Sequence, residues 1–275
     1  MSLSYISQQV TIYGGFFLVI AGTIGNGINI LVFSTYRNYR TTPCTFYFLI
    51  GSIFDILYIT INLISRVVSA GFGIDLTQTS VSWCKIRQFS LVTISLVVLT
   101  CSCLATIDQF FVTSRNANLR RFSSMKGAYR IVIIFIILWC IHGIFPLWLQ
   151  NISPVSHRCM NTNAIYAIYN SVYLLGLICG IPVLTMATFG YLTYRNIHLT
   201  RVLAEQQADR QITKMTLIQV VLLTVCIVPY AINNIYGLAT SNIIKNADRL
   251  SKEAFASTII ALIVYIYYSV CLVFV

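Results

Sequence analysis

The sequence has few charged side chains. Asp, Glu, Lys and Arg make up 9% of its 275 residues, whereas hydrophobic residues make up 57%. An ordinary soluble domain carries about one quarter charged residues. A soluble fold built from this chain would lack a polar surface, so soluble protein classes are excluded and lipid is the expected solvent.

Groups for catalysis are also scarce. The chain has three His and seven acidic residues, and most of the acids fall in predicted loops. Hydrolysis would need a metal cluster, or an acid and a base within reach of each other, and the sequence offers no such set. We therefore predict that the protein is not an enzyme and has no catalytic residue, no metal site and no bound organic cofactor.

The excess of basic residues gives a net charge of +11. Nucleic-acid binding is not predicted, because the Lys and Arg residues form short clusters between apolar runs rather than one basic face. Such clusters indicate topology instead. They also favour contact with anionic membrane lipid, which attracts each nearby Lys or Arg by about 1 kcal/mol.

Long apolar runs dominate what the sequence does contain. A membrane-spanning helix needs about 20 such residues, far more than the roughly 10 of a barrel strand. We predict an all-α membrane protein, a seven-transmembrane helix bundle that forms one domain over residues 1–275. Six uncharged runs cover residues 1–36, 88–107, 131–157, 159–194, 215–244 and 254–275, and a seventh run, 41–65, contains the single acid Asp55.

The distribution of basic residues predicts how the bundle is oriented. Loops after the first, third and fifth helices hold two, five and four of the 18 Lys and Arg residues, and the other side holds seven. Positive loops tend to stay in the cytoplasm, which puts the amino terminus outside. The start of the chain has no basic segment and no cleavage site, so the first run is read as a span rather than a signal peptide.

Asp55 stands out as the only acid within a predicted span away from its ends. A carboxylate in lipid costs about 3 kcal/mol or more unless it faces the bundle interior. We favour a functional or ion-linked role for it. The alternative is a protonated Asp55 that forms a hydrogen bond with Asn26 of the first helix and only holds the bundle together.

Two of the nine cysteines fall in predicted outward-facing segments. Cys84 and Cys159 would be in an oxidising compartment, which favours a disulfide between them. The alternative is a zinc site with the nearby His157, but the CxxC spacing of such sites is missing. Outside as well lies Asn151-Ile152-Ser153, which fits the acceptor pattern for N-glycosylation at Asn151.

Two prolines interrupt predicted spans. Pro182 lies in the fifth and Pro229 in the sixth, and each removes a backbone hydrogen bond that neighbouring helices can replace. We predict kinks that serve as hinges, and packing alone is the alternative explanation.

Taken together, these features resemble the rhodopsin-like (class A) family of G-protein-coupled receptors along nearly the whole chain, as a divergent, invertebrate-type member that is either an orphan or peptide-receptor-like. The resemblance implies that Asp55 and Asn26 belong to a polar core that holds water and a sodium ion and collapses on activation. The residues that carry it, in chain order, are Gly25-Asn26, Asp55, Cys84, Trp139, Cys159, Pro182 and Pro229.

The chain departs from the family pattern at three places. Gln109 follows Asp108 where the family has arginine, and Ile227 replaces an aromatic residue two positions before Pro229. The seventh helix lacks the Asn-Pro-x-x-Tyr motif, so we expect a carboxyl-terminal truncation. The resemblance implies coupling to a G protein through Asp108, Gln109, Arg210 and Lys214.

The ligand class is narrowed by exclusion. Relatives that bind amines have an aspartate where this chain has Leu91, and light-sensing relatives have a lysine in the seventh helix, where this chain has none. The resemblance places a ligand pocket between helices three, five, six and seven. Leu91 and Ser95 share one helical face there, and Tyr230 and Asn234 share another. Tyrosine-rich and mostly uncharged pocket walls suit a peptide or a small neutral ligand. The alternative is that these four residues only pack the helices against one another.

We therefore predict a multi-pass receptor of the plasma membrane that binds an extracellular ligand and signals through a heterotrimeric G protein. The alternative is a transporter or channel for a small solute. Transporters often show paired repeats and broken helices at the membrane midplane. This sequence has no repeat and only one central acid, which argues against transport.

Overall fold

The computed structural model describes residues 3–36, 41–153, 159–161, 164–199, 207–240 and 243–270. Within these ranges, seven helical segments are long and apolar enough to cross a membrane. The predicted all-α bundle of seven spans is confirmed. The second span runs from Pro43 to Gly71 and is longer than the stretch expected from the sequence.

The seven spans consist of α-helices and three wider π-helical segments. The elements are α1 (Leu3–Thr35); α3 (Pro43–Tyr58), η1 (Ile59–Leu63), α4 (Ile64–Arg66) and η2 (Val67–Gly71) in the second span; α6 (Val81–Thr113); α8 (Met125–Leu149); α9 (Ala164–Tyr173), η3 (Leu174–Gly180) and α10 (Ile181–Leu199) in the fifth; α11 (Gln207–Ala239); and α12 (Ala247–Ser269). Short connections contain α5 (Leu76–Thr79), α7 (Ala117–Arg120) and an antiparallel pair, β1 (Gln150–Ile152) and β2 (Cys159–Asn161).

Several helices begin where the sequence provides a cap. The Ser80 hydroxyl accepts a hydrogen bond from the backbone N–H of Trp83 at the start of α6, and Ser124 accepts one from Gly127 in α8. Asn246 does the same for α12. Each cap satisfies a backbone donor that a helix otherwise leaves without a partner. The caps therefore fix where these spans start.

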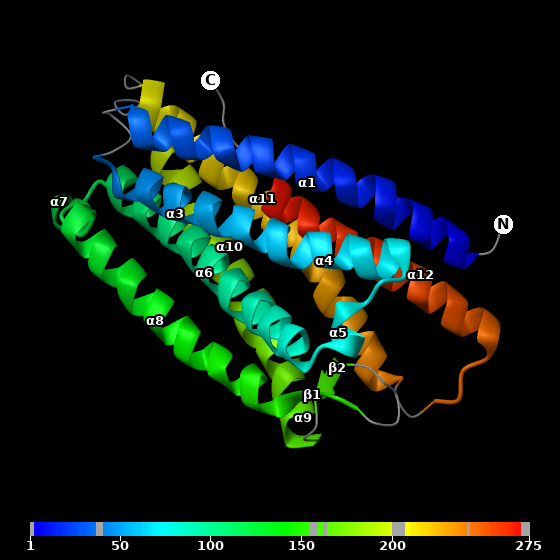
Figure 1. Ribbon diagram of the computed structural model, residues 1–275. Helices are drawn as coiled ribbons and strands as arrows, with labels where there is room; N and C mark the ends of the chain where they lie inside the picture. Colours follow the sequence, from blue (N-terminus) through cyan, green and yellow to red (C-terminus); the bar gives the residue numbers. More distant parts are fainter. Residues whose placement is uncertain are drawn as a thin grey trace.

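Helix α6 lies at the centre of the bundle (Figure 1). It packs against α3, α8 and α10, and α1 packs against α3 and α12. In the apolar stretch of α6, 72% of the residues are buried, against 17% in that of α8. The third span is therefore the core of the fold, and the other helices surround it.

Polarity is distributed in the way that lipid demands. Large apolar side chains point outward, and Trp148, Phe17 and Leu184 are 83%, 69% and 69% exposed. Asn26 and Asn62, by contrast, are fully enclosed by other helices. In water this arrangement would be costly, whereas in a bilayer it keeps polar groups away from hydrocarbon. The chain is therefore a multi-pass membrane protein.

The two ends of the bundle differ (Figure 1). We call the end that carries α5, β1, β2 and the start of α1 the disulfide end, and the opposite end the α7 end. At the disulfide end the Gln8 side chain donates a hydrogen bond of 2.7 Å to the carbonyl of Gly71, which joins the first two spans.

Both predicted hinge prolines lie inside spans. Pro182 is the second residue of α10, which begins where η3 ends, and Pro229 lies inside α11. A π turn is wider than an α turn and often marks a functional region. It also loosens the backbone just before a proline that cannot donate a hydrogen bond. A hinge motion at these residues stays a prediction.

Candidate functional site

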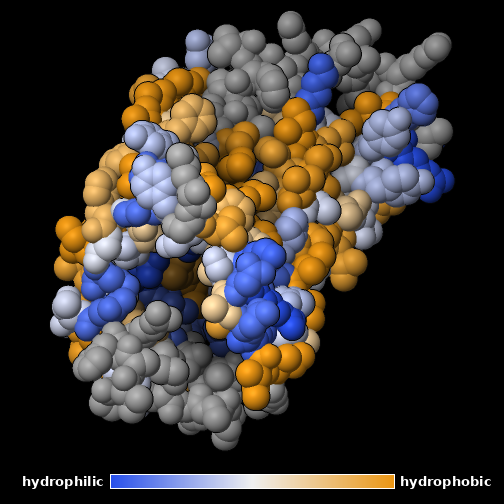
Figure 2. All heavy atoms as spheres, turned by 90° about the vertical axis from the view of Figure 1, so that its right-hand side faces the viewer, coloured by the Kyte–Doolittle hydropathy of each residue, from blue (hydrophilic) through white to orange (hydrophobic). Residues whose placement is uncertain are grey.

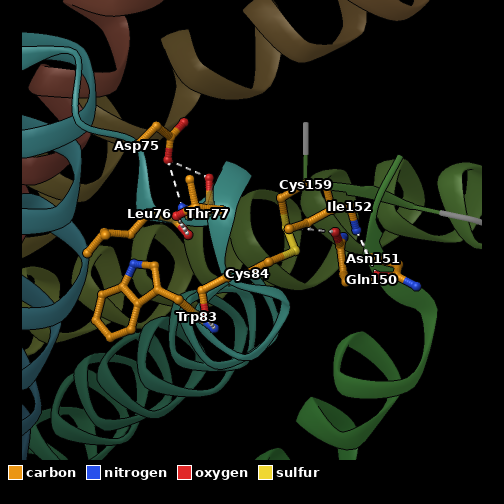
Figure 3. The surroundings of a disulfide bond; sticks show 11 residues. Asp75, Leu76, Thr77, Trp83, Cys84, Gln150, Asn151, Ile152 and Cys159 are labelled. Atoms are coloured by element: carbon orange, nitrogen blue, oxygen red, sulfur yellow. Dashed lines mark hydrogen bonds between the residues drawn. A yellow bond between two sulfur atoms is a disulfide. The ribbon is translucent and has the colours of Figure 1, made fainter. Parts of the chain in front are cut away.

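A disulfide joins Cys84, in the first turn of α6, to Cys159 in β2, with 5.7 Å between the Cα atoms. Figure 3 shows the strand pair held against the end of α6. Ile152 of β1 pairs with Cys159. The predicted disulfide is confirmed. Because the two sulfur atoms are bonded to each other, the zinc alternative is wrong; His157 lies outside the described residues.

The short helix α5 lies beside this disulfide (Figure 3) and is fixed by Asp75. Its carboxylate accepts hydrogen bonds from the backbone and the hydroxyl of Thr77 and from the side chain of Gln78. Partial burial raises the pKa of Asp75, but these hydrogen bonds outweigh it and hold the pKa below its ordinary value of 3.8. Asp75 is therefore a stable anion at neutral pH.

A cavity of about 210 Å³ lies beneath the strand pair, between the second, third, fifth, sixth and seventh spans. Figure 2 looks onto this end of the molecule, which is hollowed near its centre and bordered by hydrophilic side chains. We call it the outer cavity. Its lining residues are Tyr58, Arg66, Arg87, Gln88, Leu91, Val92, Ser95, Asn170, Tyr173, Leu174, Ile178, Ile227, Tyr230, Ala261, Val264, Tyr265 and Tyr268.

Three of the four predicted pocket residues line the outer cavity, namely Leu91, Ser95 and Tyr230. Asn234 does not, and lines a neighbouring cavity of about 350 Å³ instead. Its side chain donates to the carbonyl of Tyr230, and the Ser95 hydroxyl donates to carbonyls of its own helix. Ligand binding at these residues stays a prediction, and the structure assigns Asn234 and the Ser95 proton to helix packing.

Two cavity residues were missed by the sequence analysis, which counted Arg66 and Arg87 only as topology charges. Both residues line the outer cavity, and they are the two charged residues in a lining that is otherwise uncharged. A signal was present for one of them. Arg87, Leu91 and Ser95 recur every four residues and therefore share one face of α6. For Arg66 the 3.6-residue period gave no guide, because it lies between the π segments η1 and η2.

A second, smaller cavity lies deeper in the bundle, with a volume of about 30 Å³, enough for a water-sized occupant. Asp55 and Asn26 both line it. The Asn26 amide donates to the carbonyls of Gly22 and Tyr268, each at 3.0 Å. Among the described residues no hydrogen bond joins Asn26 to Asp55, and Asp55 Oδ1 has no partner. The alternative explanation, in which Asp55 forms a hydrogen bond with Asn26, is therefore wrong, whereas the ion-linked role stays a prediction.

Three further polar residues around this inner cavity were not predicted. The Gln219 amide donates to Ser102 Oγ at 2.7 Å, and that hydroxyl lies 2.8 Å from the hydroxyl of Tyr267. The chain of contacts ties together the third, sixth and seventh spans. Gln219 Oε1 has no partner within the described part of the chain. An isolated glutamine in the apolar run of the sixth helix was the signal that could have shown it.

A family model described as "7 transmembrane receptor (rhodopsin family)" matches residues 25–273. The chain belongs to the rhodopsin family of seven-transmembrane receptors. No curated protein matches the sequence. The family accounts for the seven spans and the receptor class of the protein.

At the α7 end, this rhodopsin-family receptor replaces the usual arginine by Gln109. Gln109 is buried, and its Oε1 accepts a hydrogen bond of 3.0 Å from the Thr213 hydroxyl of α11. Its neighbour Asp108 lies against the backbone of Cys44 and the side chain of Ser123. The third and sixth spans are thus linked here by a neutral hydrogen bond.

The other two residues predicted for coupling are only partly placed. Lys214 is exposed near the start of α11. The backbone of Arg210 belongs to α11, but its side chain lies outside the described residues. The predicted glycosylation site, Asn151, is exposed in β1 at the disulfide end and accepts a hydrogen bond from the N–H of Ile152. Its modification stays a prediction.

Proposed function

We propose that this protein is a plasma-membrane receptor that binds an extracellular ligand in the outer cavity and signals through a heterotrimeric G protein at the α7 end. The observation that carries the proposal is the outer cavity itself, which lies in a rhodopsin-family bundle and opens toward the disulfide end. The amino terminus and the disulfide then face the outside, in agreement with the distribution of basic residues. The family match gives no support to the transporter or channel alternative.

The Gln109–Thr213 hydrogen bond is proposed to hold the resting state. It joins α6 and α11 at the α7 end, where a G protein would have to insert between them. A buried neutral hydrogen bond contributes about 0.5–1.5 kcal/mol, less than one to a charged group. The resting state of this receptor is thus secured weakly, and ligand-free activity should be measurable. A ligand shifts the balance only by binding the two states with different affinity.

The test measures ligand-free nucleotide exchange on a panel of co-expressed G-protein α subunits. Thr213→Val should raise exchange about two- to tenfold over the unmodified receptor, as expected for loss of 0.5–1.5 kcal/mol. Thr224→Val is the matched control, because the Thr224 hydroxyl donates only to a carbonyl of its own helix. The receptor proposal would be refuted if neither the unmodified protein nor the variant stimulated nucleotide exchange on any α subunit. Solute uptake into vesicles would then support transport instead.

A sodium ion is proposed to bind in the inner cavity. Small hard cations take oxygen ligands, and two oxygen atoms there, Asp55 Oδ1 and Gln219 Oε1, have no partner among the described residues. Such an ion would offset the charge of Asp55 and leave the Ser102 network undisturbed. In purified receptor, NaCl should raise the melting temperature above that in choline chloride of equal ionic strength. Asp55→Asn should abolish the difference, and an equal response in that variant would refute the site.

A further inference from the structure

The outer cavity carries positive charge without a balancing acid. Arg66 and Arg87 are the two charged side chains in its lining. The ion pairs found in the described part of the chain all lie at the start of α12 and its approach, and neither arginine takes part in them. Within the ranges that the structure describes, neither arginine of the cavity lining therefore has a counter-ion.

The polar neighbours of these arginines do not neutralise them. Arg87 forms a side-chain hydrogen bond with the hydroxyl of Tyr265, and the charge of Arg66 acts on the same hydroxyl, so both arginines have this neutral tyrosine as a neighbour. Asp75 feels the charge of Arg87 only weakly and forms no ion pair with it, because its carboxylate is taken up by Thr77 and Gln78. The Nε atoms of both guanidinium groups are buried and have no hydrogen-bond partner.

This arrangement is costly for a protein that has nothing to bind there. A buried donor without a partner costs about 1–3 kcal/mol, and more when it is charged. Two guanidinium groups that converge on one tyrosine also repel each other. Arginine presents its N–H groups as a planar fork that matches the two oxygens of a carboxylate. An anionic group supplied from outside the chain, such as a carboxylate, would satisfy these donors.

We propose that the ligand of the outer cavity is an organic acid whose carboxylate binds between Arg66 and Arg87 while its apolar body lies against the tyrosine and aliphatic walls. This inference rests on the proposed function for the location of the ligand and adds its chemical class. The volume of about 210 Å³ admits an aromatic or short aliphatic body. The carboxylate belongs either to a small acid or to the carboxyl end of a peptide.

The first test needs no ligand. If the two arginines serve ligand binding at a cost in stability, Arg66→Gln and Arg87→Gln each remove an unbalanced charge. Each variant should then raise the melting temperature of the ligand-free receptor by about 2 °C or more. Lys85→Gln, on the same helix but outside the cavity lining, should leave it unchanged. A fall in melting temperature in both arginine variants would mean that the guanidinium groups hold the structure together, and would overturn the proposal.

The second test compares acids with their amides. Benzoate, 3-phenylpropanoate, indole-3-acetate and a set of pentapeptides ending in Tyr, each as free acid and as primary amide, are added to the purified receptor. At least one acid should raise the melting temperature more than its amide does. Its apparent affinity should fall about 10- to 100-fold in the Arg66→Gln/Arg87→Gln double variant, the loss expected for charge-assisted hydrogen bonds. Arg87→Lys keeps the charge without the fork and should retain part of the preference.

The outcomes separate the two proposals. If no acid exceeds its amide, or if the preference survives the double variant, the carboxylate site is wrong whatever the receptor signals. An acid that binds but never changes nucleotide exchange supports the site and refutes coupling. Preference confined to the peptides identifies a peptide carboxyl end as the source, and preference confined to the small acids identifies a metabolite-like ligand.

Discussion

The Cys84–Cys159 disulfide offers a prediction whose size depends on the membrane. The two cysteines are 75 residues apart in sequence. For a chain that unfolds completely in water, closing such a loop would stabilise the folded state by about 4.5 kcal/mol through lost entropy of the unfolded chain. In a bilayer the spans remain inserted when tertiary contacts are lost, so most of that loop is never free.

The free part of the loop is the segment between the end of α8, at Leu149, and Cys159, roughly ten residues. The same relation then gives about 2.7 kcal/mol. Cys84→Ser should lower the stability of the purified receptor by about that amount, Cys159→Ser by the same amount, and the double variant by no more than either, because both single changes remove one bond. Cys140→Ser, at a free cysteine of α8, is the control for the substitution itself.

The assay is thermal or denaturant-induced unfolding in detergent. Unfolding is monitored by a signal that needs no ligand, such as near-ultraviolet circular dichroism. Losses that add in the double variant would show that the two thiols act separately. A loss near 4.5 kcal/mol would contradict the argument in another way, since it would mean that the α6 and α8 spans leave their inserted state on unfolding.

Three further results are expected, each checked by unfolding of the purified receptor. Gly143→Ala should cost about 1–3 kcal/mol, because an added Cβ would lie closer than 3.0 Å to side chains of α6, whereas Gly14→Ala meets no atom within 4 Å and should be neutral. Thr100→Val should cost about 1–3 kcal/mol, because the Trp139 indole N–H loses its acceptor at 2.9 Å; an unchanged stability would show that this bond is replaced. The stability that Asp75 confers is complete above its unfolded pKa of 3.8 and is lost as the pH falls through its lower folded pKa. Asp75→Asn should remove that part of the acid response, and an identical acid profile would refute its role.

The spans could be predicted because lipid imposes a strong rule on sequence. A run of about 20 apolar residues leaves few structures open to the backbone, so the count of seven and the position of Asp55 followed directly. The end of the second span did not, because η2 carries the helix on to Gly71 past the charge of Arg66. Charge marks the end of a span only when it faces water.

Site predictions succeeded where they depended on a rare residue type and failed where they depended on the direction in which a side chain points. Two cysteines in outward segments left few pairings, so the disulfide was found. A hydrogen bond between Asn26 and Asp55 was the alternative to an ion-linked role, and it failed because the Asn26 amide donates to two backbone carbonyls instead. Arg66 and Arg87 were read as topology signals. The four-residue spacing of Arg87 with Leu91 and Ser95 could have shown that Arg87 faces the cavity, whereas no such spacing marks Arg66, because π segments flank it.

The shape of α6 also limits how the two ends of the receptor can communicate. It runs for 33 residues without proline, glycine or a π turn, unlike the second, fifth and sixth spans. Arg87 and Gln109 therefore sit on one stiff rod, about 33 Å apart along its axis at 1.5 Å per residue. A tilt imposed on one end arrives at the other as the same tilt, so no relay of rearranging side chains is required between them.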